Sequence, residues 1–107
     1  MYAHEKKALK RVTEKLKKRF PNRIVSVYAF GSMVRGDHSE WSDLDVLVIV
    51  RDKTPKIEAS IINIFVDEEM QSGIPFGPVV KDLGTFEMEK KYNTPFYENI
   101  MKEGVLL

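Results

Sequence analysis

Residues 24–50 of this 107-residue chain read IVSVYAFGSMVRGDHSEWSDLDVLVIV, and this stretch decides the fold. It contains two runs rich in β-branched and aromatic residues, 24–30 and 44–50, which predict two strands. A polar segment that begins at Gly31-Ser32 separates them. The second run is almost continuously apolar, which is typical of a strand that helices cover on both faces.

The flanking segments predict helices and one more strand. Apolar residues recur every three or four positions from His4 to Phe20, which predicts an amphipathic helix. Thr54-Pro55 is a typical helix start, since a threonine cap precedes a proline at the first helical position. The remaining expected elements are a helix over 56–71, a chain break at 73–78, a strand over 79–83, and helices over 85–91 and 95–103. This order predicts an α/β fold, a small mixed sheet flanked by helices.

Length and composition limit the class of protein. At 107 residues, with 43% hydrophobic and 31% charged residues, the chain is expected to form one domain over 1–107. No apolar run reaches the roughly 20 residues that span a bilayer, and the first residues do not resemble a signal peptide. The absence of cysteine excludes disulfides, thiolate metal sites and a cysteine nucleophile. These features predict a cytoplasmic protein that does not bind membranes.

Charge is distributed unevenly along the chain. Residues 1–23 carry nine basic and two acidic residues, although the whole chain has a net charge of only +1. Such a block can contact nucleic acid. The solvated face of a helix explains it more simply, so a nucleic-acid partner is not expected.

Two carboxylates stand at the start of the second apolar run. Asp43 and Asp45 are two residues apart, so on a strand their side chains project to the same face, with Cα atoms roughly 6–7 Å apart. This spacing suits one or two divalent cations. Oxygen ligands favour Mg²⁺, with Mn²⁺ as the alternative, over Zn²⁺.

The residues after the first strand are suited to binding phosphate. Gly31 allows close approach of the backbone to a ligand, and Ser32 adds a hydroxyl donor. Arg35 follows about one turn later, where its guanidinium can meet a phosphate. These groups meet Asp43 and Asp45 only if the two strands are antiparallel neighbours.

Residues 31–36 (GSMVRG) and 42–48 (SDLDVLV) together resemble the DNA polymerase beta-like nucleotidyltransferase superfamily, specifically its minimal stand-alone members. The resemblance implies the polymerase beta-like fold. It also implies transfer of a nucleoside monophosphate from an NTP to a hydroxyl acceptor, with AMP as the expected group and ATP as the expected NTP. Asp43 and Asp45 would be catalytic and hold two Mg²⁺ ions. Gly31 and Ser32 would bind the β- and γ-phosphates, and Arg35 would belong to the nucleotide site.

One family feature is not evident in the sequence. Members usually carry a third carboxylate on a neighbouring strand, and Asp82 comes late in the expected third strand.

The resemblance also implies a partner, because minimal members often pair with a helical HEPN-type protein in toxin–antitoxin systems. A homo-oligomer is the alternative, since residues 56–71 and the Val105–Leu107 tail are strongly apolar. The alternative function is a non-catalytic nucleotide-binding or antitoxin-like module that pairs with a helical partner. A glycosyltransferase using Asp-x-Asp would need a longer chain.

Overall fold

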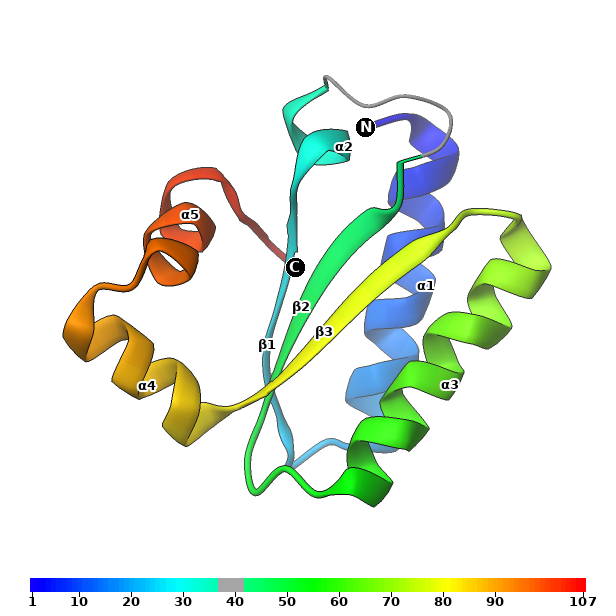
Figure 1. The fold of residues 1–107 in the computed structure, drawn as a ribbon. Helices are drawn as coiled ribbons and strands as arrows, with labels where there is room; N and C mark the ends of the chain where they lie inside the picture. Colours follow the sequence, from blue (N-terminus) through cyan, green and yellow to red (C-terminus); the bar gives the residue numbers. More distant parts are fainter. Residues whose placement is uncertain (37–41) are drawn as a thin grey trace.

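A four-stranded sheet forms the centre of the protein in the computed structural model, which describes residues 1–36 and 42–107 (Figure 1). Its strands lie in the order β3-β2-β1-β4. β1 pairs antiparallel with both β2 and β4, whereas β2 and β3 are parallel. The bounds are β1 Ile24–Phe30, β2 Leu44–Val50, β3 Phe76–Asp82 and β4 Val105–Leu106.

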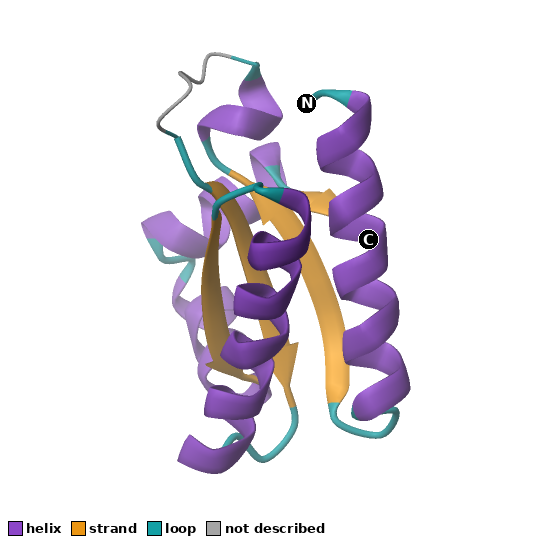
Figure 2. Cartoon of the chain, turned by 90° about the vertical axis from the view of Figure 1, so that its right-hand side faces the viewer, coloured by secondary structure: helices purple, strands orange, loops and turns teal. Residues whose placement is uncertain are grey.

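Helices cover both faces of this sheet. α1 and α3 lie on one face and α4 and α5 on the other (Figure 1), and Figure 2 shows α1 and α3 side by side in front of the strands. A fifth helix, α2, is a single turn directly after β1. The helix bounds are α1 Ala3–Arg19, α2 Ser32–Arg35, α3 Pro55–Ser72, α4 Leu83–Tyr92 and α5 Pro95–Glu103.

β2 shows how the two faces are built. Its even-numbered residues, Leu44 to Val50, pack in the core under α1 and α3. Leu47 and Ile49 pack in a second core with residues of α4 and α5. Because side chains alternate along a strand, Asp43 and Asp45 belong to the face that α4 and α5 cover.

Several sequence predictions are confirmed. The strands over 24–30 and 44–50 have the predicted bounds, they are antiparallel neighbours, and the sheet is mixed and flanked by helices. The connection from β2 through α3 to β3 joins parallel strands, as in a βαβ unit. Thr54 caps α3 by accepting a hydrogen bond from the Ile57 amide at 3.2 Å.

The prediction for the third strand was wrong at its start. β3 begins at Phe76, so Gly77 and Pro78 lie inside it instead of breaking the chain before Val79. Pro78 is tolerated because β3 is an edge strand with one neighbour, so its missing N–H removes no bond to a second strand.

The two segments that are strongly apolar in sequence, residues 105–107 and residues 56–71, differ in how far the structure buries them. Val105 and Leu106 form β4 against Ala29 and Tyr28, so the tail is an edge strand of this chain's own sheet. On α3, Ile61 and Phe65 are buried. In contrast, a stripe of three side chains spaced four residues apart remains exposed, namely Ile62, Val66 and Met70. The Met70 residue has an exposed fraction of 81%.

Part of the basic N-terminal block holds the α1–α3 layer together. Glu68 of α3 is fully buried, and its carboxylate accepts hydrogen bonds from the Arg11 guanidinium, at 3.1 Å from Nη2. The Lys15 ammonium lies 3.8 Å from the same carboxylate. At least two of the nine cations of residues 1–23 therefore neutralise a buried acid.

Within residues 1–36 and 42–107, no helix is both long enough and apolar enough to cross a bilayer.

Candidate active site

The end of β1 and the start of β2 lie side by side. Antiparallel pairing places Phe30, the last residue of β1, opposite Asp45. Gly31 follows Phe30 directly and leads into α2. The Gly31-Ser32 turn and the Asp43–Asp45 pair therefore meet at one end of the sheet, as the antiparallel arrangement requires.

Gly31 and Asp45 are in unusually close contact. Gly31 has φ +86° and ψ −166°, a backbone conformation that is essentially restricted to glycine. A Cβ atom at this position would lie 2.2 Å from Oδ2 of Asp45. Only a residue without a side chain allows the backbone and this carboxylate to approach so closely.

The short helix α2 begins at this contact. Gly31 is its N-cap residue, and the Arg35 and Gly36 amides donate to the Gly31 and Ser32 carbonyls at 3.2 and 3.0 Å. The first amides of a helix have no acceptor within the helix and carry partial positive charge. This turn therefore presents an electropositive backbone close to two carboxylates.

The two carboxylates differ in environment. Asp43 is exposed and Asp45 is half-buried. Burial raises the pKa of Asp45 above its ordinary value, the negative charge of Asp43 raises it further, and the Arg35 guanidinium opposes both effects. A raised pKa means that the ionised Asp45 is destabilised in the protein alone, so a cation at this position would be favoured.

Arg35 links the site to α5. Its guanidinium Nη1 lies 3.2 Å from Oε2 of Glu103, the last residue of α5. The positive charge predicted for the nucleotide site is thus held at the end of α2, between the acid pair and α5. The sequence pattern contained no signal for the contribution of Glu103.

The neighbouring strand β3 places a glycine next to the acid pair. Gly77 is the register partner of Asp45, and a Cβ atom on Gly77 would lie 3.0 Å from Oδ1 of Asp45 and 3.5 Å from Cβ of Asp43. Gly77 is therefore the β3 position that faces the pair. In the part of the chain that the structure describes, no three acidic or histidine side chains gather as a metal-binding group.

Asp82, the candidate for a third carboxylate, lies elsewhere. It pairs with Val50 at the opposite end of β3, five residues from Gly77 and therefore about 16 Å away along the strand. Its carboxylate accepts hydrogen bonds from the Lys53 and Gly84 amides, both at 2.9 Å, and caps α4. These bonds lower the pKa of Asp82. Asp82 thus has a structural role at the start of α4.

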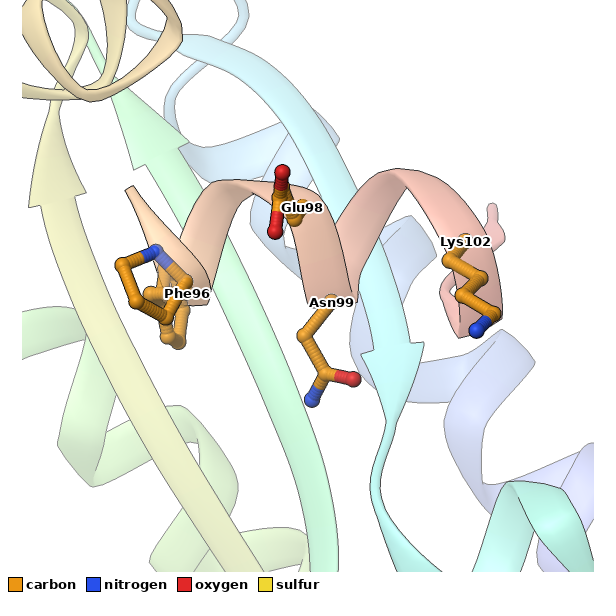
Figure 3. A pocket seen from close by; sticks show the side chains of 5 residues that line it. Phe96, Glu98, Asn99 and Lys102 are labelled. Carbon is orange, nitrogen blue, oxygen red and sulfur yellow. The ribbon is translucent and has the colours of Figure 1, made fainter. Parts of the chain in front are cut away.

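A shallow pocket of about 540 Å³ lies beside α5 on the same face of the sheet as the acid pair. Figure 3 shows Phe96, Glu98, Asn99 and Lys102 around it, and Pro95 completes the lining. The sequence predicted only a helix over 95–103, with no signal for this pocket.

Comparison with known proteins identifies the family of this chain. The model of the nucleotidyltransferase domain family matches residues 9–107. Two candidate protein adenylyltransferases of Methanocaldococcus jannaschii are similar in sequence. The first is 30% identical over 97% of this chain and 98% of its own length. The second is 31% identical over 78% of this chain and 79% of its own length.

Solved structures give the same result for the fold. A candidate nucleotidyltransferase from Sulfolobus solfataricus is 26% identical, with a TM-score of 0.51 over 94% of this chain and 76% of that one. A mutant of the MntA–HpeT toxin–antitoxin and a toxin–antitoxin with AMP-PNP have TM-scores of 0.55 and 0.56 at 17% and 16% identity. The matched region covers 92% and 90% of this chain, and 70% and 69% of the chains in those two structures. With its fold, its Gly-Ser turn and its paired aspartates, this chain belongs to the nucleotidyltransferase domain family.

Proposed function

We propose that this protein transfers AMP from ATP to a hydroxyl group of a partner protein, with Mg²⁺ bound by Asp43 and Asp45. The observation that supports the proposal is the close contact between Gly31 and the Asp45 carboxylate. It brings the turn that we propose to bind phosphate against the carboxylates that we propose to bind the metal. Glycine is required there by both space and backbone conformation.

The donor set suits the proposed metal. Asp43 and Asp45 supply carboxylate oxygens, which Mg²⁺ and Mn²⁺ prefer, and bound phosphates and water complete such sites. When bound, Mg²⁺ would neutralise charge on the phosphates and on the pyrophosphate that leaves. The raised pKa of Asp45 supports this role, because a cation would relieve the repulsion from Asp43.

The other residues of the site bind and orient the nucleotide. The α2 amides and the Ser32 hydroxyl donate to the β- and γ-phosphates, and the Arg35 guanidinium adds a positive charge beside them. The acceptor oxygen then forms a bond to the α-phosphorus. The bond from that phosphorus to the oxygen bridging to the β-phosphate breaks, pyrophosphate leaves, and the acceptor proton passes to solvent. Positioning and charge neutralisation provide most of the catalysis in such a transfer.

The acceptor is proposed to be a protein on two grounds. The two relatives described above are named as candidate protein adenylyltransferases, and two structures of the same fold are described as toxin–antitoxin. In addition, the exposed stripe of Ile62, Val66 and Met70 on α3 offers a contact surface for a helical partner.

A second candidate function is favoured by Gly77. Without an acid at this position, residues 1–36 and 42–107 place two carboxylates, Asp43 and Asp45, near the proposed metal site instead of three. A protein that binds ATP and a helical partner but transfers nothing would fit that arrangement as well.

Labelling experiments separate these functions. The full chain is incubated with Mg²⁺, the product of the adjacent gene, and ATP labelled at either the α- or the γ-phosphate. Transfer of AMP predicts labelling of the partner from α-labelled ATP alone, and loss of labelling in Asp43→Asn and Asp45→Asn. Glu14→Gln, an exposed change on α1, is the matched control and should transfer normally.

The results that contradict the proposal are equally distinct. ATP binding and complex formation without label would support the non-catalytic module. Label from γ-labelled ATP would indicate phosphate transfer instead. Light scattering on the isolated chain distinguishes a homodimer from a monomer that associates only with its partner.

A further inference from the structure

The pocket beside α5 has a definite orientation relative to the acid pair. Pro95, Asn99 and Lys102 recur at helical spacing and form one side of α5. In Figure 3, Asn99 and Lys102 extend from the edge of α5 that faces the end of β1, where α2 begins. The opposite side of α5, with Tyr97 and Met101, lines a separate pocket next to α4.

Phe96 connects the pocket to the proposed phosphate site. Its ring packs edge-on against Phe30, with ring centroids 5.8 Å apart. Phe30 is the register partner of Asp45 and precedes Gly31. Residues that lie opposite each other on antiparallel strands have Cα atoms roughly 5 Å apart. Phe30 therefore lies between Phe96 and the end of β2 that carries the acid pair, a separation that a ribose and one phosphate can bridge.

The Phe96 ring is held firmly. The Lys81 ammonium lies 3.9 Å from its centroid and is itself ion-paired with Glu89. Together with Phe30, these groups fix the ring on its sheet side while Phe96 also borders the pocket. A fixed aromatic ring at the edge of a pocket is a suitable surface for stacking a nucleobase.

Asn99 supplies hydrogen-bonding groups next to this ring. Its side chain offers one N–H donor group and one carbonyl acceptor. Adenine presents the complementary pair, an N6 donor beside a ring-nitrogen acceptor, whereas guanine presents two acceptors, O6 and N7, on the equivalent edge. Glu98 is already engaged, since it accepts a hydrogen bond from Asn93 Nδ2 at 2.6 Å.

We infer that this pocket is the base subsite of the nucleotide, in which adenine stacks on Phe96 and Asn99 selects it over guanine. The inference rests on the proposed function, because it places the base of the same ATP whose phosphates lie at Gly31-Ser32. Lys102, at the end of the pocket nearer to Glu103, lies toward the ribose hydroxyls.

The test measures binding of Mg²⁺-ATP, Mg²⁺-GTP and Mg²⁺-tripolyphosphate to the full chain by calorimetry. Asn99→Ala should weaken ATP about tenfold, as expected for one to two lost hydrogen bonds, and leave GTP and tripolyphosphate unchanged. Phe96→Leu should weaken both nucleotides about fivefold or more through lost stacking, again without affecting tripolyphosphate. Asn63→Ala, an exposed change on α3, is the matched control and should bind as wild type does.

Tripolyphosphate binding shows that each variant is folded and that the phosphate site is intact. Wild-type affinity for ATP and GTP in both Asn99→Ala and Phe96→Leu would overturn the base subsite alone. Failure of the wild-type chain to bind tripolyphosphate or ATP in the presence of Mg²⁺ would overturn the proposed function, and the inference with it.

Discussion

Replacing Gly31 by alanine tests the close contact on which the site depends. The new Cβ would lie 2.2 Å from Oδ2 and 3.1 Å from Cγ of Asp45, so the carboxylate must rotate away. An off-rotamer side chain costs about 1 kcal/mol. The backbone conformation at φ +86° and ψ −166° adds roughly 2–3 kcal/mol for a residue with a side chain. The expected loss in unfolding free energy is therefore about 3–4 kcal/mol.

Gly36 provides a matched control at the other end of α2. Its φ is +82° with ψ 8°, the ordinary left-handed region, and nothing lies within 4 Å of an added Cβ. Gly36→Ala should thus lose only about 1 kcal/mol, from backbone strain alone. Urea unfolding of both variants, followed by circular dichroism, gives the two values at equal protein concentration.

The contact with Asp45 also predicts coupling between the two positions. In an Asp45→Ala background the carboxylate that meets the new Cβ is gone, so Gly31→Ala should cost about 1 kcal/mol less than it does in the wild type. The reasoning is refuted if Gly31→Ala is no more destabilising than Gly36→Ala, or if its cost is the same with and without the Asp45 carboxylate.

Three further predictions concern individual acids and their positions. Asp45→Asn should stabilise the metal-free protein at pH 7 by about 0.5–1 kcal/mol, since the raised pKa shows that ionisation of Asp45 opposes folding. Thermal melts should show this gain shrinking as the pH falls below the pKa of Asp45, where the wild-type carboxyl is protonated; a constant gain would contradict the assignment. Asp82→Ala should lower the urea midpoint of unfolding at pH 7, because the lowered pKa of Asp82 reflects hydrogen bonds that its ionised form accepts. That loss of stability should vanish as the pH falls through the folded-state pKa, and calorimetry should show unchanged Mg²⁺-ATP binding; weakened binding would return Asp82 to the site. Gly77→Asp should bring a third carboxylate to the pair, raise Mg²⁺ affinity and lower metal-free stability, and a titration showing unchanged Mg²⁺ affinity would mean that Gly77 does not face the metal.

The local part of the site could be predicted from the sequence. The two strands over 24–30 and 44–50 follow from their β-branched composition, and the period of two residues puts Asp43 and Asp45 on one face. The antiparallel pairing that brings Gly31 to Asp45 was a stated requirement, which the structure meets. These features depend on neighbouring residues or on a single short connection between strands, so they can be predicted from local sequence patterns.

The features that sequence analysis missed depend on register between distant segments. Gly77 and Pro78 read as chain breakers because their effect depends on β3 being an edge strand beside β2. Asp82 remained a candidate third acid because nothing local shows that it pairs with Val50 instead of Asp45. The Phe30–Phe96 contact joins residues 66 positions apart in the chain and became visible only in three dimensions.

Binding of Mn²⁺, followed by electron paramagnetic resonance, tests the central claim that Asp43 and Asp45 hold a divalent cation for a nucleotide at Gly31. The full chain is titrated with Mn²⁺ with and without a non-hydrolysable ATP analogue, and Asp45→Asn is compared with the control Asp67→Asn. We expect the analogue to tighten Mn²⁺ binding in the wild type and in Asp67→Asn. Asp45→Asn should lose at least about tenfold in Mn²⁺ affinity, as expected for a missing charged ligand. Equal Mn²⁺ affinity in the wild type and Asp45→Asn, with the analogue present, would show that Asp45 does not bind the cation.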